Sequence, residues 1–516
     1  MAACAMDNQN RRDAERSPPP PTDRVLSFYH NVTVLVTGGT GFLGKVLLEK
    51  ILRTLNVRKV FLAVRSKDGQ QPVERLQHLL KDVIFDRLRR ELTVEQLLER
   101  VEPVEISLAA NGLGIDSVTE RRLLEETELV FNVLASVKFN ENIKQAIDTN
   151  VGGTRKVLQL ARRMRRLRAV VHVSTLYSNC DRTRIEERIY TDSAVNPSSV
   201  LQLSNLLSTE EMDAFQHCLV GALPNTYTFS KKCAESLIQQ EFGDLPVGIF
   251  RPPIVLSTYR EPIAGWTDNL NGPAGLCLWT VQGYVRVIRG NRRKKANLVP
   301  VDYCVNALVV AGFDVAERSI RRQCGVAADP PGRQDERVNG GSWESQQLVP
   351  VYNYMYAKAN LTWGRYMESV SIGFDSWIKQ LCWHYSYTIV PSRALFGALS
   401  FCCHTVPASV LDFIRQLLGK RPLYRRMVAK TNRFLETMSY FGLREWHIAN
   451  DNVVRLRTML TPSEATMLEF DMSTVDWDEY FQAYIPGIRR YFLAEKKLTD
   501  FSPSRARKTR PQWARR

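Results

Sequence analysis

The fold is decided by the stretch Thr33-Val34-Leu35-Val36-Thr37-Gly38-Gly39-Thr40-Gly41-Phe42-Leu43-Gly44. Its first part is β-branched and apolar, as in a buried strand, and its second part is a glycine-rich turn. After the turn, apolar residues recur at three- and four-residue spacing, which predicts a helix with one apolar face. These residues are Phe42, Leu43, Val46, Leu47, Ile51 and Leu55. A strand, a glycine turn and a helix in this order begin a parallel α/β unit.

The spacing of the glycines predicts a dinucleotide site at this turn. Gly38 permits the tight turn, Gly41 lets the backbone approach a pyrophosphate, and Gly44 lets the helix pack closely on its strand. The start of the helix directs free N–H groups and a partial positive charge at the phosphates. Glycine spacing alone is a weak signal, and a cluster that merely closes the turn is the alternative.

Strand-like runs and helical patterns continue to alternate along the chain. The expected strands are residues 59–64, 101–108, 129–135, 169–174 and 247–251, with helices over 73–90 and 153–167. This alternation predicts an α/β fold, a doubly wound parallel sheet of the Rossmann type. We expect a nucleotide-binding domain over 25–355 that includes an inserted substrate lobe at about 181–223.

The rest of the chain predicts a mainly α-helical domain over 361–497. We expect a disordered tail over 1–24 before the nucleotide-binding domain and a basic tail over 498–516 after the helical domain. The net charge of +16 favours anionic partners such as phosphate-bearing cofactors or acidic lipid headgroups. Nucleic acid is not expected, because aromatic residues are not interleaved with the basic ones. The ten scattered cysteines favour a reduced compartment, and the seven histidines show no spacing of metal ligands, so no metal is expected.

One segment, 394–411, contains no Asp, Glu, Lys or Arg and is about as long as a membrane span. Residues such as His404, Thr405 and Pro407 dilute its apolar character. A re-entrant or surface-lying hairpin therefore competes with a true span, and a buried pair of helices is the third alternative.

The residues after the second expected strand indicate which nucleotide binds. A carboxylate there would bond the ribose 2′-hydroxyl of NAD, but this chain has Arg65 and Lys67, with no carboxylate before Asp68. A guanidinium suits a 2′-phosphate, which favours NADPH. Two basic residues that only end an exposed loop are the alternative.

A second group of residues predicts carbonyl reduction. Tyr227 and Lys231 are four residues apart and share one face of a helix. We expect the ammonium group to lower the pKa of the phenol, so that Tyr227 donates a proton near neutral pH. Ser174 and Thr175 follow the fifth strand, where a hydroxyl would reach a substrate carbonyl. An ordinary surface helix and a strand-capping serine are the alternative.

Together these features resemble the extended short-chain dehydrogenase/reductase superfamily. Longer stretches resemble the alcohol-forming fatty acyl-CoA reductases, in particular the insect type. The resemblance covers roughly 25–493 and is carried by residues 37–44, 171–179, 227–235, 251–255, 261–273, 299–303, 352–354 and 471–480. The stretch Glu261-Pro262-Ile263-Ala264-Gly265-Trp266-Thr267-Asp268-Asn269-Leu270-Asn271-Gly272-Pro273 is the most family-specific of these.

The resemblance implies NADPH-dependent reduction of a long-chain or very-long-chain fatty acyl-CoA to a primary alcohol, with an aldehyde-level intermediate and release of CoA. It implies that Tyr227 donates the proton and that Lys231 adjusts the pKa of Tyr227 and binds the nicotinamide ribose. It also implies that Ser174 or Thr175 holds the carbonyl oxygen of the substrate in place. The implied cofactor-binding residues are Gly38, Gly39, Thr40, Gly41, Phe42, Leu43, Gly44, Arg65, Lys67, Asn150 and Ile254. An intracellular membrane is the expected location, the endoplasmic reticulum before peroxisomes or lipid droplets.

Two stretches depart from the family pattern near the cofactor. Ile106-Ser107-Leu108 replaces the usual Gly-Asp-Leu, and Asn132-Val133-Leu134-Ala135-Ser136 replaces a strand end in His-Ala-Ala-Ala. We expect weaker cofactor binding from both. The basic run 292–295 is expected to meet the phosphates of CoA or to form a solvated loop, and the 181–223 lobe and the helical domain to shape the acyl channel. A sterol or sugar-nucleotide reductase and a non-catalytic dinucleotide sensor are the alternative functions.

Overall fold

The computed structural model describes residues 23–66, 69–139, 141–190, 196–281, 283–325, 349–356, 361–378 and 387–493. The basic tail and residues 1–22 of the expected N-terminal tail lie outside these ranges, as does Lys67. Within the expected tail, Arg24 already begins helix α2 (Arg24–Tyr29), whose Val25 and Tyr29 are buried. The burial of this apolar face shortens the predicted tail at its C-terminal end.

The centre of the protein is a seven-stranded sheet in which every neighbouring pair is parallel. Its order is β11-β7-β5-β4-β1-β2-β3. The strands are β1 (Thr33–Thr37), β2 (Lys59–Val64), β3 (Val101–Glu105), β4 (Leu129–Asn132), β5 (Ala169–Val173), β7 (Val247–Arg251) and β11 (Val351–Asn353). The predicted doubly wound sheet is confirmed. The third and fourth strands end earlier than predicted, and β11 at the edge was not predicted.

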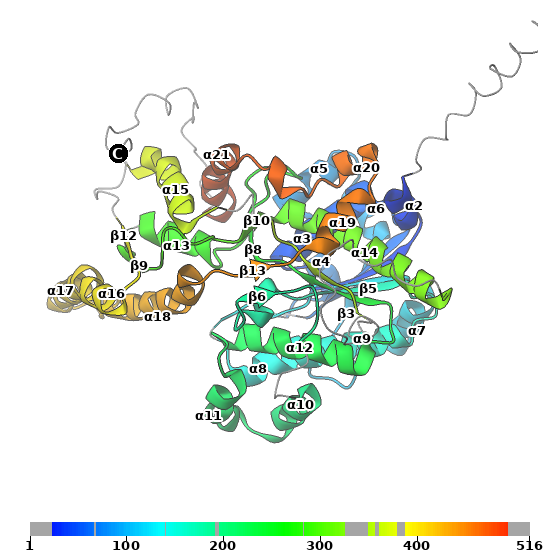
Figure 1. Ribbon diagram of the computed structural model, residues 1–516, viewed down its shortest axis with the longest axis horizontal. Coiled ribbons are helices and arrows are strands. Elements are labelled where there is room, and N and C mark those ends of the chain that lie inside the picture. The colour runs from blue at the N-terminus through cyan, green and yellow to red at the C-terminus, as the bar shows by residue number, and fades with distance from the viewer. Residues whose placement is uncertain are drawn as a thin grey trace, which may run out of the picture.

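Helices cover both faces of the sheet (Figure 1). On one face lie α3 (Phe42–Thr54) and α14 (Val301–Gln323), and on the other α9 (Gly153–Arg162) and α12 (Thr226–Phe242). Strand β1 shows why both faces are apolar, since Val34 and Val36 join one buried cluster and Leu35 joins the other. Such continuous apolar strands are typical of a parallel sheet buried on both sides.

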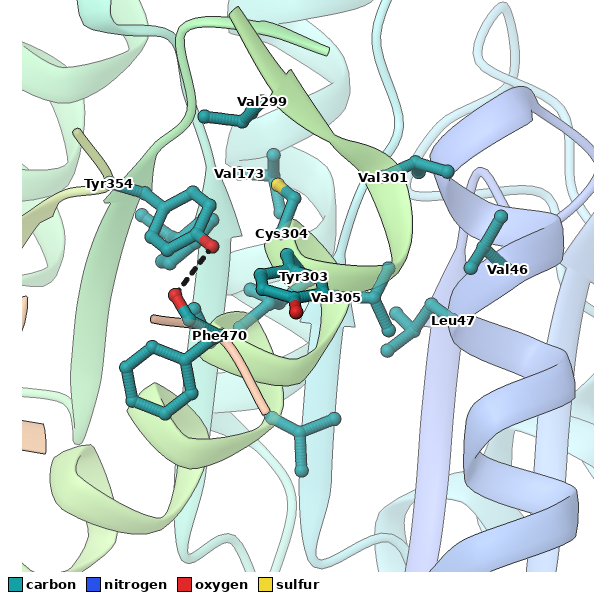
Figure 2. Packing of buried hydrophobic residues seen from close by; sticks show 14 of the residues in the cluster. Val46, Leu47, Val173, Val299, Val301, Tyr303, Cys304, Val305, Tyr354 and Phe470 are labelled. Atoms are coloured by element: carbon teal, nitrogen blue, oxygen red, sulfur yellow. Dashed lines mark hydrogen bonds between the residues drawn. The ribbon is translucent and has the colours of Figure 1, made fainter. Parts of the chain in front are cut away.

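The cluster under α3 and α14 also receives residues from the C-terminal part of the chain. Figure 2 shows Val46 and Leu47 of α3 facing Val301 and Val305 of α14. In the same cluster the hydroxyl of Tyr354 donates a hydrogen bond of 2.9 Å to the carbonyl oxygen of Phe470. The C-terminal region therefore packs directly on the nucleotide-binding core.

The helix predicted over 73–90 is broken. It consists of α4 (Pro72–Leu80), a 3₁₀ turn (Val83–Phe85) and α5 (Asp86–Arg89). Asp82 causes the break, because its carboxylate accepts the N–H of Ile84 at 3.2 Å and forms an ion pair of 2.8 Å with Lys45 of α3. The helix predicted over 153–167 is α9, which ends at Arg162.

The remaining helices of the first half are α6 (Val94–Arg100), α7 (Ser117–Glu126), α8 (Ile143–Ile147), α10 (Pro197–Leu206), α11 (Thr209–Val220) and α13 (Pro273–Val281), with a π-helical turn (Asp148–Gly152) and a 3₁₀ turn (Leu176–Asn179). Three two-stranded pairs complete the strands. They are β8 (Ile254–Leu256) with β10 (Leu298–Pro300), β9 (Val287–Arg289) with β12 (Thr388–Val390), and β6 (Arg184–Ile185) with β13 (His447–Ile448).

The C-terminal region is helical, as predicted. It contains α15 (Trp363–Ile378), α16 (Arg393–Ser400), a π-helical turn (Phe401–Thr405), α17 (Val406–Leu417), α18 (Tyr424–Leu443), α19 (Asp451–Thr458), α20 (Pro462–Met467), a 3₁₀ turn (Met472–Thr474), α21 (Trp477–Gly487) and a π-helical turn (Ile488–Phe492). Glu464 of α20 accepts the N–H groups of Val25 and Leu26 at 2.6 and 3.0 Å. The boundaries of separate domains, including the one at 361, stay a prediction.

Candidate active site

A pocket of about 760 Å³ opens where the chain connections change direction between β1 and β4. Ligands of open α/β sheets bind at this place, outside the carboxyl ends of the strands. The predicted site residues in its lining are Gly38, Thr40, Gly41, Phe42, Leu43, Gly44, Arg65, Ser174, Thr175, Tyr227, Lys231 and Ile254. Gly39 and Asn150 do not line it. The structure thus brings the glycine turn and the Tyr227–Lys231 pair into one cavity.

The glycine turn fits a pyrophosphate. Gly38 has φ +70°, and a Cβ there would lie 2.7 Å from the backbone of Val133 and Leu134. A Cβ on Gly44 would overlap the carbonyl oxygen of Gly38, so this glycine packs against the turn itself. The sequence had led us to expect that it packs on the strand. Gly41 begins α3 without a side-chain cap, which leaves the first N–H groups of the helix for an anion.

Two arginines line the far end of the pocket beyond β2. Arg65 is exposed there, and Arg75 of α4 reaches the same wall and donates a hydrogen bond to the carbonyl oxygen of Arg65. Between them, Ser66 donates to the carboxylate of Glu105. Sequence reasoning missed Arg75, although a basic residue in the first turn of the helix after β2 was a readable signal.

Ile106-Ser107-Leu108, the first departure from the family pattern, gives the end of the pocket near Arg65 an apolar wall. Ile106 is buried and lines the pocket after β3. The loop that follows is held by Lys156, whose ammonium group donates to the carbonyl oxygens of Leu108 and Ala110 at 2.6 and 2.8 Å. The loop is thus fixed without the usual carboxylate.

The second departure forms a buried polar chain below the glycine turn. Thr37 of β1 donates to the Asn132 amide oxygen at 2.7 Å, and the Asn132 amide nitrogen lies 3.0 Å from Nδ1 of His172 on β5. Burial, aided by the charge of Lys231, holds the pKa of His172 well below its usual value. The neutral ring therefore accepts from Asn132, and the chain links the ends of β1, β4 and β5.

Tyr227 lies in the first turn of α12, where the side chain of Asn225 caps the helix by accepting the N–H of Thr228 at 2.9 Å. Burial raises the pKa of Tyr227 to about 12, and a hydrogen bond with the hydroxyl of Thr175 opposes this rise. The expected lowering by Lys231 is wrong for the protein alone. Desolvation of the phenol outweighs the hydrogen bond, and Tyr227 is protonated at neutral pH.

Lys231 faces the backbone rather than the phenol. It is 1% exposed, and its ammonium group donates to the carbonyl oxygen of Val173 at 2.7 Å. Burial lowers the pKa of Lys231 to about 8, against the opposing charge of Glu235. With this pKa the group is mostly charged at neutral pH, and it lines the pocket.

Ser174 and Thr175 differ in the partners of their hydroxyls. Ser174 donates to Glu235 at 2.5 Å, and Glu235 forms a buried ion pair of 2.6 Å with Arg251. Thr175 instead bonds Tyr227. Of the two candidates for the carbonyl oxygen, Thr175 therefore lies with the phenol. The sequence did not reveal that Glu235 would take the hydroxyl of Ser174.

Asn150 lies behind the pocket wall. Its amide oxygen accepts the N–H of Ser136 at 2.8 Å, and its amide nitrogen donates to the carbonyl oxygen of Ser136 and the hydroxyl of Ser230, at 3.1 and 2.9 Å. It joins the loop after β4 to the helix of Tyr227. These contacts make it a positioning residue in this structure.

The end of the pocket beyond Tyr227 is apolar and aromatic. Its lining includes Val137, Phe139, Tyr177, Met438 and Phe441. The Phe139 ring centroid lies 5.8 Å from that of Tyr227, and the Phe441 centroid 4.8 Å from that of Tyr177. Helix α18 of the C-terminal region thus shapes this end of the pocket.

The lobe expected at 181–223 does not line the pocket in the part of the chain that the structure describes. Its strand β6 instead pairs with β13, and Ile185 of β6 is buried in the core. The basic run 292–295 also lies elsewhere. Arg292 pairs with Glu368, and Lys294 and Lys295 lie 3.4 and 3.7 Å from Glu445. Within the described ranges no group of His, Cys, Asp and Glu side chains could hold a metal.

Comparisons with known proteins give the fold and a family of this chain. An NAD-binding family model described as male sterility protein matches residues 36–308, and a second model with that description matches 403–495. The reductase domain of a nonribosomal peptide synthetase from Mycobacterium tuberculosis has the same fold, with a TM-score of 0.51 and 20% identity over 90% of this chain and 95% of that chain. The NAD-binding match and the glycine turn together identify a nicotinamide dinucleotide site.

Two curated relatives define the family. "Fatty acyl-CoA reductase wat" of Drosophila melanogaster is 34% identical over 470 residues, which cover 91% of this chain and 85% of the relative. "Fatty acyl-CoA reductase 2" of Mus musculus is 31% identical over 478 residues, covering 91% and 86%. Because this identity extends over most of both chains, the protein belongs to the fatty acyl-CoA reductase family.

Proposed function

We propose that the protein reduces a long-chain fatty acyl-CoA to a primary alcohol, with NADPH as reductant. The observation that carries the proposal is the common pocket, in which the phenol of Tyr227 and the hydroxyl of Thr175 lie between the glycine turn and an aromatic, apolar end. When bound along the turn, one NADPH would supply a hydride to the carbonyl carbon of the thioester, and a second NADPH, which replaces the spent NADP⁺, would supply one to that of the aldehyde.

The side chains act at the carbonyl oxygen. Tyr227 and Thr175 donate hydrogen bonds to the negative charge that develops there. The first oxyanion collapses, the carbon–sulfur bond breaks, and CoA leaves as the thiolate with formation of the aldehyde. The second oxyanion takes the proton of Tyr227 and becomes the alcohol. A phenol with a pKa of about 12 remains protonated until this alkoxide, a stronger base, forms beside it.

The preference for NADPH rests on the two arginines after β2. Arg65 and Arg75 line the pocket on either side of Ser66, and the carboxylate at this end, Glu105, is hydrogen-bonded to that serine. Two guanidinium groups suit the ribose 2′-phosphate, which NADH lacks. Gly38 and Gly41 hold the pyrophosphate in this proposal, and Ile106 packs against the adenine.

We also propose that the protein works at an intracellular membrane, the endoplasmic reticulum first. Among the described residues, one helix, Arg393–Leu417, is long and apolar enough to cross a membrane by length and composition. Fatty acyl chains partition into membranes, so a membrane contact places the enzyme beside its substrate.

The purified chain, incubated with NADPH and acyl-CoAs of several lengths, tests the proposal. We expect fatty alcohol and free CoA to appear in equal amounts, with two NADPH consumed for each alcohol. Turnover of a sterol or a sugar nucleotide instead would favour another reductase of the superfamily. Binding of NADPH without turnover of any acyl-CoA would leave a dinucleotide sensor.

A further inference from the structure

The helices α16 and α17 have polar residues on the inside and apolar residues on the outside. Ser400, His404, Ala408 and Asp412 follow one another at four-residue spacing, and each is at most 4% exposed. The opposite side presents large apolar side chains to solvent. They include Phe401, Val410, Phe413, Ile414, Leu417 and Leu418, which are 46–72% exposed. A surface helix of a soluble protein normally has the reverse pattern.

The buried polar residues attach this helix to the protein. Nε2 of His404 accepts the N–H groups of Arg286 and Val287 at 2.9 and 3.3 Å. The carboxylate of Asp412 accepts three N–H groups at the start of α18, at 2.7 to 2.9 Å. Both residues are therefore satisfied by the protein, and the apolar side remains without a partner within the described part of the chain.

A true span conflicts with what precedes and follows the helix. Before it, β12 pairs with β9, and after it α18 returns to the pocket with Met438 and Phe441. Further on, Glu464 of α20 accepts the N–H of Val25 near the start of the described chain. One crossing would put these flanking parts on opposite sides of the bilayer, but they belong to one packed body (Figure 1).

The charges around the apolar side indicate the kind of surface that it meets. Between 393 and 434 the only acidic residue is Asp412, which is buried, whereas the basic residues are Arg393, Arg415, Lys420, Arg421, Arg425, Arg426, Lys430 and Arg433. Lys420, Arg421, Arg425, Arg426 and Lys430 are exposed. Apolar side chains flanked by exposed cations are typical of helices that lie in the interface of an anionic membrane.

We propose that α16 and α17 dock flat on a bilayer that carries anionic headgroups, with the apolar side in the acyl layer and the basic residues of the α17–α18 connection and of the first turns of α18 at the phosphates. This inference refines the membrane contact proposed above and rests on it. Helix α18 then joins the membrane surface to the acyl end of the pocket, because its first residues follow the docked helix and Met438 and Phe441 line the pocket. An acyl-CoA can reach Tyr227 from the bilayer along this helix.

Flotation of the full chain with vesicles tests the docking. We expect binding to phosphatidylcholine vesicles and stronger binding when phosphatidylserine is added, with the increment lost at high salt. The double variant Phe413→Ser, Leu417→Ser should lose binding to both. Its matched control is Leu206→Ser, Phe215→Ser on α10 and α11, where the side chains are 80% and 54% exposed. The control should bind like the wild type, and equal loss in both variants would overturn the proposal.

The basic residues have a separate test. In the double variant Arg425→Gln, Arg426→Gln, the affinity for anionic vesicles should fall about fivefold for each charge removed. Its affinity for phosphatidylcholine vesicles should not change. All these side chains are exposed, so the melting temperature of each variant should match the wild type. An unchanged response to phosphatidylserine would overturn the role of the charges.

Orientation is tested in microsomes from cells that express the chain with a tag at each end. Docking predicts that protease removes both tags without detergent, whereas protection of one tag would show a span and overturn the proposal. These measurements do not depend on turnover. A chain that makes fatty alcohol but ignores vesicles overturns the docking alone, and a chain that binds vesicles as predicted but makes no alcohol overturns only the reductase proposal.

Discussion

The two ends of the pocket are built in different ways. The nucleotide end lies at the ends of β1, β2, β4 and β5, its shape depends on Gly38 and Gly44, and Arg65 and Arg75 give it positive charge. The acyl end consists of large side chains, with Phe139 from the loop after β4 and Phe441 from α18 more than three hundred residues away. The first end recognises charge and a fixed shape, and the second offers only apolar surface. Substitutions at the nucleotide end should therefore weaken NADPH binding and those at Tyr227 should slow reduction, while those at the acyl end should change which substrate is preferred.

The largest effect on the rate of alcohol formation is expected at Tyr227, which lies between the two ends of the pocket. Tyr227→Phe removes the proton donor but keeps the ring that lies against Phe139. The rate of alcohol formation should fall about 10²- to 10⁴-fold, the usual contribution of a positioned acid. NADPH binding, measured by fluorescence, should change little, and a variant with the wild-type rate would remove Tyr227 from the mechanism.

Gly38→Ala tests the fixed shape of the nucleotide end. The backbone has φ +70° here, and the added Cβ would lie 2.7 Å from the backbone of Val133. Strain of this kind costs about 1–3 kcal/mol, so NADPH affinity should fall about tenfold or more. The control is Gly397→Ala in α16, where a Cβ meets open space. If both variants bind NADPH like the wild type, the turn does not hold the pyrophosphate.

The charge at the nucleotide end is tested by Arg65→Ala and Arg75→Ala. Each should raise the KM for NADPH about 10- to 100-fold, because a charge-assisted hydrogen bond to the 2′-phosphate is lost. The KM for NADH should change little. Lys81→Ala, an exposed residue at the end of α4, is the matched control. Equal changes for both nucleotides would contradict the 2′-phosphate role.

The same contrast explains how far the sequence could predict the structure. Local patterns sufficed for the sheet strands β1 to β5 and β7, for the glycine turn and for the place of Tyr227 and Lys231 in the pocket lining. Long-range contacts did not follow from them. Glu235 takes the hydroxyl of Ser174 and pairs with Arg251 from another strand, so the choice of Thr175 needed the fold.

The acyl end shows the same limit. The 181–223 lobe was expected to shape the acyl channel, yet its described residues do not line the pocket, and α18 supplies Met438 and Phe441 to the wall. The raised pKa of Tyr227 was equally out of reach, since the sequence shows the distance to Lys231 along the helix but not the extent of burial.

The pH dependence of the reduction rate tests the role of Lys231. The pKa of Lys231 is lowered to about 8, so its ammonium form predominates below that pH. If the charge supports reduction, the rate should be level below pH 8 and fall about tenfold per pH unit above it. Lys231→Arg, which stays charged, should lack this fall even at a lower overall rate. A fall at the same pH in Lys231→Arg would assign the titration to another group.

The smallest effect is expected at the acyl end. Phe441→Leu opens space beside Tyr177 without removing the apolar surface. Relative rates among acyl-CoAs of different length should shift several-fold toward longer chains, with the KM for NADPH unchanged. Phe434→Leu on the same helix is the control, because Phe434 packs on Trp279 outside the pocket. An unchanged chain-length profile in Phe441→Leu would place the acyl chain elsewhere.

The measurement that tests the account most directly uses NADPH with deuterium on the transferred position of the nicotinamide. If one pocket carries out both reductions, the alcohol made from unlabelled acyl-CoA should carry two deuterium atoms on the carbinol carbon. Alcohol without deuterium, or aldehyde with one deuterium as the final product, would contradict a double reduction beside Tyr227.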